Sequence, residues 1–174
     1  MAMVEIREFE AGDAEAFRAL NEEWITRYFA LEPRDVETLG DPETKILARG
    51  GQIFFAIREG QPVGCVALMT MGEREFEISK MAVTPAAQGQ GLGRKLMMKA
   101  IETARARGAA RLYLQSNHTL TAAIALYESV GFRHLPAGHS PYTRADVRME
   151  MLLKQGTGNR DQGTADKCLK IRGD

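Results

Sequence analysis

The chain has 174 residues and a mass of 19.2 kDa; 44% of its residues are hydrophobic and 26% are charged. These values are ordinary for one soluble globular domain. Lys and Arg together number 23, as do Asp and Glu, so the formal net charge is zero. This balance argues against a general binder of nucleic acid or of acidic membranes.

The sequence excludes several other classes of protein. The longest nearly apolar run, residues 63–71, is too short to cross a bilayer, and residues 1–8 contain no apolar signal region, so neither membrane insertion nor export by that route is expected. Cys65 and Cys168 are the only cysteines and lie far apart, which excludes a disulfide framework and a zinc knuckle. No metal-ligand spacing is formed by the histidines, His118, His134 and His139. A reduced cytoplasmic protein without a metal is therefore expected.

The first part of the chain is expected to contain a short strand and two helices. Residues 4–9 alternate apolar and charged side chains, as a strand does. Asp13 is a candidate N-cap for a helix, and Pro33 marks the end of that helix. The apolar stripe of this helix consists of Phe17, Leu20, Trp24, Tyr28 and Leu31. A second helix begins at residues 41–43 and stops at the glycine pair 50–51.

Three strands of a meander follow, at residues 53–58, 63–71 and 75–83, with turn sequences between them. The third strand is irregular, because its four apolar residues do not share one parity. Phe76 and Ile78 have one parity, and Met81 and Val83 have the other. A β-bulge near residues 79–80 would place all four on one side, but burial of both faces of the strand would explain the pattern equally well.

After residue 83 the elements alternate. A helix from residue 92 to about 107 precedes a strand at 111–115, and Asn117 or Thr119 is a candidate cap for the next helix, which ends at Gly131. The last strands are expected at residues 132–135 and 147–153. This order predicts a single α/β or α+β domain with a mixed sheet over residues 4–154. Residues 155–174 hold four glycines and scattered charge, which predicts an unfolded tail or, alternatively, an arm that docks on a partner chain.

A glycine-rich loop lies between the third meander strand and the long helix. Residues 88–95 read Gln-Gly-Gln-Gly-Leu-Gly-Arg-Lys. Glycines let the main chain approach a ligand closely, the N–H groups of the first helical turn point outward, and the helix dipole adds partial positive charge. Arg94 and Lys95 add full charges beside them. An anion site is therefore favoured over a simple glycine-rich turn.

The spacing of the glycines narrows the choice of anion. A dinucleotide fingerprint or a nucleoside-triphosphate loop starting at Gly89 would each need a glycine at position 94, where Arg94 stands. The pattern Gln/Arg-x-x-Gly-x-Gly/Ala does fit, at Gln88, Gly91 and Gly93. This pattern is similar to the pyrophosphate-binding motif of the GNAT superfamily of acyl-coenzyme A N-acyltransferases.

The resemblance extends from about Val4 to Lys154. Residues 77–83 resemble the central fourth strand of the family and residues 112–117 its fifth strand, while residues 123–132 resemble the helix and the Leu-Tyr-x-x-x-Gly-Phe close of its second cofactor motif. The resemblance implies a GNAT-type fold: a mixed, mostly antiparallel sheet of about seven strands, flanked by four helices, with a splay between strands four and five. Family members bulge in the fourth strand, which favours the bulge here.

The resemblance also implies acetyl-coenzyme A as the cosubstrate and assigns residues to it. The residues that match the family's cofactor-binding positions are Met81, Ala82, Val83, Gln88, Gly89, Gln90, Gly91, Leu92, Gly93, Arg94, Lys95, Asn117 and Tyr127. Main-chain N–H groups near the bulge would bind the pantetheine arm and polarise the thioester carbonyl. Asn117 could instead serve only as a helix cap, and both roles are compatible.

Two residues are candidates for the chemistry. Glu77 matches the family position whose glutamate takes a proton from the amine, although a solvated strand carboxylate is the simpler interpretation and Glu75, two residues away, could be the one that matters. Tyr127 matches the tyrosine that protonates the departing thiolate; its helical spacing alone would favour a core tyrosine, and the family match reverses that judgement.

The acceptor side is less defined. Tyr142, Arg144 and Asp146 precede the last strand, near where family members admit the acceptor, although an Arg–Asp pair is more often a surface ion pair of little consequence. The loop expected at residues 32–40 could roof this pocket. The stripe of the first helix is expected to be core.

These observations predict an N-acetyltransferase that moves the acetyl group directly to an amine in a ternary complex, since Cys65 lies away from the motifs and a covalent acyl-cysteine route has little support. The zero net charge of the chain slightly favours a small amine or amino acid as the acceptor, over a lysine or N-terminus of a protein. The alternatives are an acetyl-coenzyme A sensor without turnover and, more remotely, an interaction protein that keeps only the fold. A homodimer, common in the family, stays open.

Overall fold

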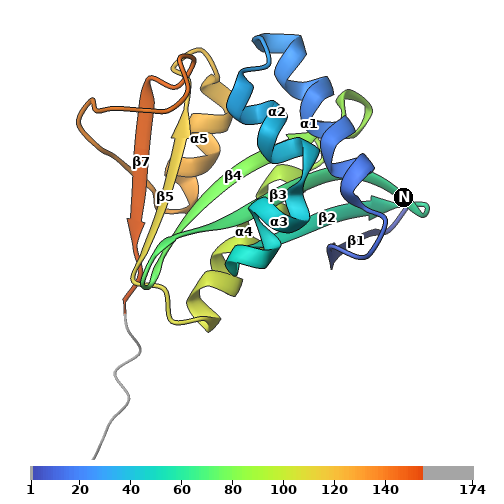
Figure 1. The fold of residues 1–174 in the computed structure, drawn as a ribbon, viewed down its shortest axis with the longest axis horizontal. Coiled ribbons are helices and arrows are strands. Elements are labelled where there is room, and N and C mark those ends of the chain that lie inside the picture. The colour runs from blue at the N-terminus through green and yellow to red at the C-terminus, as the bar shows by residue number, and fades with distance from the viewer. Residues whose placement is uncertain (1, 155–174) are drawn as a thin grey trace, which may run out of the picture.

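The computed structural model describes residues 2–154, which form a seven-stranded sheet with helices on both faces (Figure 1). The strands are β1 Val4–Glu8, β2 Gln52–Arg58, β3 Gln61–Gly72, β4 Glu75–Val83, β5 Arg111–Ser116, β6 Arg133–His134 and β7 Val147–Leu152. They lie in the order β1-β2-β3-β4-β5-β7-β6, and every neighbouring pair is antiparallel except β4 and β5, which are parallel. The predicted tail and Cys168 lie outside the described residues.

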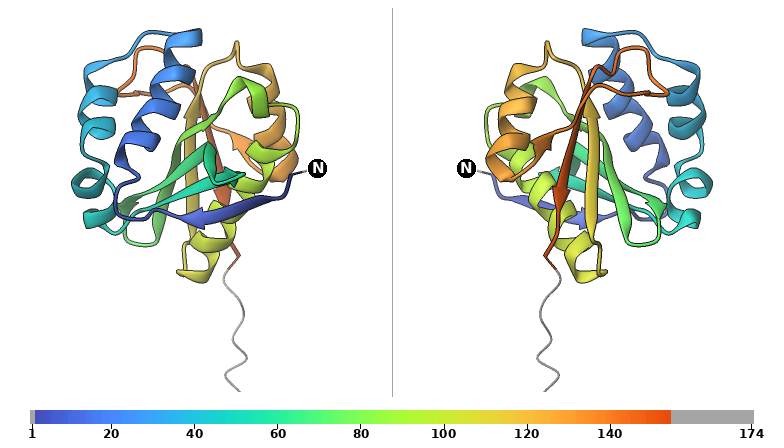
Figure 2. Two further views of the ribbon diagram at one scale, coloured as in Figure 1. Left: turned by 90° about the vertical axis from the view of Figure 1, so that its right-hand side faces the viewer. Right: turned by 90° about the vertical axis from the view of Figure 1, so that its left-hand side faces the viewer.

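The helices divide between the two faces of the sheet. They are α1 Ala14–Tyr28, α2 Pro33–Gly40, α3 Pro42–Lys45, α4 Leu92–Ala106 and α5 Thr121–Val130, with short 3₁₀ turns at Leu47–Arg49 and Pro85–Ala87. Figure 2 shows α1, α2 and α3 on one side of the sheet and α4 and α5 on the other. The GNAT-type mixed sheet predicted from the sequence is confirmed.

One more α-helix is present in the described residues than the four expected, because Pro33 begins α2 instead of ending α1. Proline suits the first turn of a helix, where its missing N–H has no partner to bind in any case. The Asp35 carboxylate accepts a hydrogen bond from the main-chain N–H of Glu32 at 2.9 Å and so closes the first turn. Leu31, predicted on the stripe of α1, lies beyond the end of α1, and the predicted loop at residues 32–40 is a helix.

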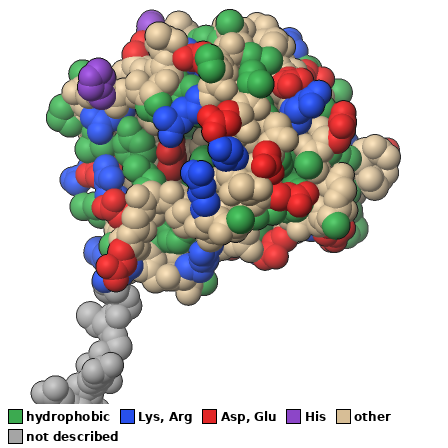
Figure 3. Space-filling model, in the orientation of Figure 1, with side chains coloured by type: hydrophobic (Ala, Val, Ile, Leu, Met, Phe, Trp, Pro, Cys, Tyr) green, Lys and Arg blue, Asp and Glu red, His purple; other side chains and the backbone are tan. Residues whose placement is uncertain are grey.

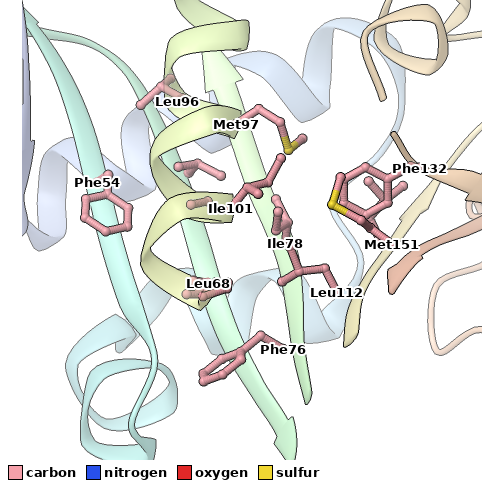
Figure 4. Close-up of a cluster of buried hydrophobic side chains, with 14 of the residues drawn as sticks. Phe54, Leu68, Phe76, Ile78, Leu96, Met97, Ile101, Leu112, Phe132 and Met151 are labelled. Carbon is pink, nitrogen blue, oxygen red and sulfur yellow. The ribbon is translucent and has the colours of Figure 1, made fainter. Parts of the chain in front are cut away.

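Helix α4 packs on the sheet through the stripe that its sequence predicts. All six predicted side chains are buried, namely Leu92, Leu96, Met97, Ala100, Ile101 and Ala104. They meet apolar side chains of β2, β3, β4 and β5, such as Phe54, Leu68, Ile78 and Leu112 (Figure 4). A second cluster on the opposite face includes Phe17 of α1. Strands β2 and β3 are apolar over most of their length, as strands with both faces covered are.

Strand β4 contains the predicted bulge. Cys65 of β3 pairs with Ala82 and Ala67 pairs with Ser79, so two residues of β4 lie opposite one residue of β3. Lys80 sits in the bulge with φ at +53°, in the left-handed region. The bulge shifts the parity of the strand, and the four apolar residues in question all pack against the α4-side core, namely Phe76, Ile78, Met81 and Val83.

Strands β4 and β5 separate soon after they meet. They pair only from Glu75 with Arg111 to Glu77 with Tyr113, although β4 continues to Val83 and β5 to Ser116. Figure 1 shows the two strands diverging like the arms of a V. The predicted splay is thus confirmed, and it opens a gap in the middle of the sheet.

Two predicted helix caps differ from the structure. Asp13 stands at the N-cap of α1, but its side chain binds Arg7 and no helical N–H. The Asn117 side chain accepts from the N–H of Thr119 at 2.9 Å and forms a local turn, so α5 begins later, with Leu120 as its N-cap. Asparagine side chains often bind the main chain two residues ahead in this way, which competes with helix capping.

The surface is mixed in character. On the face shown in Figure 3, acidic and basic side chains are interspersed, as the zero net charge leads one to expect. Among residues 2–154, no helix has the length and apolar character needed to span a membrane.

Candidate active site

A cavity of about 620 Å³ occupies the gap between β4 and β5. Its walls come from the end of α1, from β4 beyond the last pair with β5, from the glycine-rich loop, from the starts of α4 and α5, and from residues 142–145. The predicted site residues that line it are Glu77, Met81, Ala82, Val83, Gln88, Gly89, Gly91, Leu92, Gly93, Arg94, Asn117 and Tyr127. Two predicted residues, Gln90 and Lys95, are not part of the lining.

The glycine-rich loop presents its main chain to this cavity. The first hydrogen bond of α4 runs from the N–H of Lys95 to the carbonyl of Gly91 at 3.1 Å, and within residues 2–154 the N–H groups of residues 89–94 have no protein acceptor. Gly89 and Gly91 both have φ at +75°, and a Cβ at either position would meet no atom within 4 Å. Glycine is thus required here by main-chain conformation, and the unpaired donors at a helix N-terminus fit a diphosphate.

Side chains hold the loop in place. The Gln88 amide donates to the carbonyl of Val83 at 3.0 Å, which ties the loop to the end of β4. The Arg94 guanidinium donates to the hydroxyl of Ser129 on α5 at 3.0 Å. Gln90 instead accepts a hydrogen bond from an arginine of β2 on the outer side of the loop. Of the two basic residues predicted to attract an anion, only Arg94 lines the cavity.

Glu77 lies where β4 and β5 part. Burial raises the pKa of Glu77, and a 3.3 Å hydrogen bond from Gln115 together with the charges of Lys80 and Arg34 opposes that rise. A carboxyl group with a raised pKa takes up a proton more readily near neutral pH, as a general base should. Glu75, the alternative from the sequence, does not line the cavity.

Tyr127 combines the core position that its helical spacing favours with a place on the wall of the cavity. Its ring packs against the α4-side core, with its centre 6.4 Å from that of Phe132 in an edge-on arrangement, and the residue also lines the cavity. Burial raises the pKa of Tyr127 to about 12, so the hydroxyl keeps its proton at neutral pH. A protonated hydroxyl beside the cavity can donate to a departing anion.

The opposite end of the cavity holds an ion network that the sequence did not reveal. Asp35 of α2 is fully buried and receives two hydrogen bonds from the Arg144 guanidinium, at 2.6 and 2.8 Å, and one from the Lys80 ammonium at 2.6 Å. Arg144 also binds the Glu32 carboxylate at 3.0 Å, and Lys80 donates to the Tyr142 hydroxyl at 3.2 Å. We call Glu32, Asp35, Lys80, Tyr142 and Arg144 the acceptor-side network.

Burial alone would raise the pKa of Asp35, but the hydrogen bonds from Arg144 and Lys80 outweigh it and bring the pKa to about 2. Asp35 is therefore ionised at neutral pH, and its charge balances the two cations. The expected surface pair of Arg144 with Asp146 does not form, because Arg144 turns inward to Asp35 and Asp146 binds His118 instead. The partners are 45 and 109 residues apart along the chain, so no local pattern indicates their pairing.

An aromatic wall completes this end. Trp24 and Tyr28, expected in the core, line the cavity together with Phe29. The ring centres of Trp24 and Tyr28 are 5.3 Å apart, and Tyr28 is 46% exposed. This end of the cavity therefore presents an aromatic surface.

Other chemistry is not supported by the described residues. Within residues 2–154, no group of three or more His, Cys, Asp or Glu side chains could hold a metal ion. Cys65 is fully buried, and burial raises the pKa of its thiol to about 12. A thiol in this state is a poor nucleophile.

With this geometry in view, comparison with known proteins defines the class of the chain. A family model described as the acetyltransferase (GNAT) family matches residues 15–132. The chain therefore belongs to the GNAT acetyltransferases and is an acyltransferase.

Among its relatives, the uncharacterized N-acetyltransferase YjgM of Escherichia coli K12 is 35% identical over 122 residues, which are 64% of this chain and 73% of that protein. The [ribosomal protein bS18]-alanine N-acetyltransferase of the same organism is 32% identical over 99 residues, 57% of this chain and 67% of that one.

Solved structures share the fold. The ribosomal-protein-S18-alanine N-acetyltransferase of Escherichia coli superposes with a TM-score of 0.71 at 26% identity, over 90% of this chain and 98% of that one. The yncA structure from Salmonella typhimurium, described with its cofactor acetyl-CoA, has a TM-score of 0.69 at 23% identity, over 88% and 96% of the two chains.

Proposed function

We propose that this chain transfers the acetyl group of acetyl-coenzyme A directly to a primary amine of a small molecule or amino acid. The observation that carries the proposal is one cavity that joins three features: a helix N-terminus with unpaired N–H groups, a gap in the sheet, and Glu77 with Tyr127 on its walls.

The residues present fit acetyl-coenzyme A. The main-chain N–H groups of residues 89–94 would hold the diphosphate, and β4 from Met81 to Val83 would hold the pantetheine arm in the gap. Asn117 lines the same gap from the end of β5. When bound there, acetyl-coenzyme A supplies a thioester carbonyl as the electrophile.

Two side chains of the protein then accept and donate the protons of the reaction. The amine nitrogen forms a bond to the carbonyl carbon, the carbon–sulfur bond breaks, and the proton lost by nitrogen passes to Glu77 directly or through water. The Tyr127 hydroxyl donates a proton to the sulfur, which leaves as the thiol of coenzyme A; solvent then takes the proton from Glu77 and returns one to Tyr127. The products are an N-acetylated amine and free coenzyme A, and the buried Cys65 has no part in the transfer.

A second acceptor class has support from one relative. The similarity to a [ribosomal protein bS18]-alanine N-acetyltransferase favours the N-terminal amine of a protein as an alternative acceptor. The two classes differ in size, so a single assay separates them.

The test is release of free thiol from acetyl-coenzyme A in the presence of a panel of small amines, amino acids and peptides with a free N-terminal alanine. We expect turnover with a small amine, and Tyr127→Phe should slow it without weakening coenzyme A binding. Turnover with the peptides alone would support the second acceptor class. A rise in melting temperature with coenzyme A but no turnover on any amine would indicate a sensor and contradict the proposal.

A further inference from the structure

Gln115 occupies a special position beside the proposed base. It lies on β5, two residues past the last pair between β4 and β5, and its main chain pairs with Arg148 of β7 on the other side. Its side chain lines the cavity. The Gln115 amide nitrogen donates to Oε1 of Glu77 at 3.3 Å.

The rest of the Gln115 side chain is unusual. Its carbonyl oxygen is buried, and within residues 2–154 it has no hydrogen-bond partner. Buried polar atoms without a partner are rare, because each forgoes the hydrogen bond that it would make in water. The carbonyl oxygen of the Gln115 amide can thus still accept a hydrogen bond, and it lies next to a carboxyl group that gains and loses a proton.

An amide suits such a neighbour because it carries both a donor and an acceptor. In the present orientation its N–H donates to the ionised carboxylate of Glu77. A half-turn about the last side-chain torsion of Gln115 would place the carbonyl oxygen there instead, where it can accept from the protonated carboxyl. Lysine or glutamate at this position could serve only one of the two states well.

The other charged groups around Glu77 do not replace this contact. Lys80 on β4 and Arg34 on α2 lower the pKa of Glu77 by their charge, against the larger effect of burial, but the Lys80 ammonium hydrogen-bonds to Asp35. The other titratable residues that line the cavity are Tyr28, Arg94, Tyr127, Tyr142 and Arg144. Within residues 2–154, Gln115 is the one side chain that hydrogen-bonds to the Glu77 carboxyl group.

We infer that Gln115 is a positioning residue that holds the Glu77 carboxyl group in one orientation through both of its protonation states, by donating to the carboxylate and accepting from the acid. The inference rests on the proposed function only for the role of Glu77 as the base. Gln115 acts on the reaction through Glu77 and sets the pH range in which the base is ionised.

The test follows the titration of Glu77 itself and needs no acceptor. The side-chain carboxyl carbon of Glu77 is observed by NMR in protein labelled with ¹³C-glutamate, and Glu77→Gln identifies its signal. Gln115→Met keeps the length of the side chain but removes both hydrogen-bonding groups. The matched control is Gln61→Met, at an exposed position at the start of β3.

We expect Gln115→Met to raise the pKa of Glu77 by about one unit, because the hydrogen bond lost from the ionised carboxylate is stronger than the one lost from the neutral acid. The same substitution should move the acid limb of the turnover profile upward by the same amount. The control should leave the titration unchanged. A folded Gln115→Met protein whose Glu77 titrates as in the wild type overturns the inference.

Gln115→Glu covers the case in which Gln115→Met fails to fold, since it retains size and shape. Two carboxyl groups at this distance would share a proton, so their joint titration should extend to higher pH than that of Glu77 in the wild type. A titration identical to the wild type would contradict the inference.

The double variant Glu77→Gln with Gln115→Glu distinguishes a positioning role of Gln115 from a role in packing alone. It keeps one carboxyl and one amide in the same space but moves the carboxyl to β5. We expect the exchange to restore the stability lost in Gln115→Glu while turnover stays low; recovered turnover would contradict the assigned roles. Absence of turnover in the wild type would count against the proposed function alone, because the titration is read without it.

Discussion

The two ends of the cavity offer their ligands different kinds of contact. At the proposed cofactor end, the main-chain N–H groups of residues 89–94 are presented by a loop whose glycines have left-handed geometry. At the other end, the network around Asp35 joins α2, the β4 bulge and residues 142–144 mainly through side chains, with the main-chain N–H of Thr143 also donating to Glu32. A main-chain site is encoded in a few consecutive residues, whereas a side-chain network depends on how distant segments fold together.

This difference has a functional consequence. Main-chain donors bind any ligand that carries the same diphosphate, so the cofactor end is independent of the acceptor. The proposed acceptor end can change its shape and charge by substitution of a few side chains. Substitutions at each end of the cavity, and at Glu77 between the two ends, test this difference.

The largest effect is expected at that meeting point. Glu77→Gln should reduce turnover by between about 100-fold and 10,000-fold, because it removes the proposed general base but leaves its shape. Steady-state kinetics with the acceptor found by the thiol-release screen would measure the change. Glu75→Gln, on the same strand but outside the cavity, is the matched control. Equal rates for Glu77→Gln and the wild type would remove Glu77 from the mechanism.

The next largest effect is expected in the acceptor-side network. Asp35→Asn should lower the free energy of unfolding by roughly 3 kcal/mol, because it leaves the buried Lys80 ammonium without its counter-charge and Arg144 with Glu32 alone. Urea denaturation would measure the loss. The control is Glu37→Gln, on the same helix, which breaks an exposed ion pair with Lys45 of α3. It should change the free energy of unfolding by less than about 1 kcal/mol. Similar losses for the two variants would show that the network contributes little.

A smaller effect is expected at the cofactor end. Gly91→Ala should weaken coenzyme A binding about tenfold, because alanine disfavours the left-handed φ of +75° that aims the N–H groups. Isothermal titration calorimetry would measure the change. Gly60→Ala is the control, because Gly60 has the same φ of +75° and the same open surroundings in the turn between β2 and β3, outside the cavity. It should reduce stability without changing affinity, and equal affinities for the two variants would contradict the proposed site.

The smallest expected effect is on stability at Glu77. Its pKa is raised in the folded state, so its favourable contribution is present below the pKa of the unfolded chain and is lost as pH rises through the folded value. Glu77→Gln should therefore be more stable than the wild type above that pH and lose this advantage in acid. Thermal melts at pH 4 and pH 8 would compare the two proteins, and a variant that is less stable at pH 8 would contradict the sign.

The same contrast explains what can be predicted from the sequence. The α4 stripe and the glycine-rich loop are predictable, because periodic or consecutive residues encode each of them. The residue pattern of β4 fits a bulge and two covered faces equally well, and only the resemblance to the GNAT family favours the bulge that the structure contains. The roles of Glu77 and Tyr127 stay predictions, although both residues line the cavity.

The predictions that were wrong depend on contacts between segments, which consecutive or periodic residues do not show. Pro33 can end one helix or begin the next, and only the closing contact between Asp35 and Glu32 shows which applies. The sequence suggests Asp146 as the partner of Arg144 because nothing in it places Asp35 beside that arginine. It suggests a core position for Trp24 and Tyr28 because a helical stripe does not show where a cavity interrupts the packing.

The most direct test of the central claim is a crystal structure of the protein with coenzyme A. The account predicts the diphosphate within hydrogen-bond distance of the main-chain N–H groups of residues 89–94, with the pantetheine arm passing between β4 and β5 and its sulfur beside Tyr127. Coenzyme A bound elsewhere on the protein, with the gap between the two strands left free of it, would contradict the account.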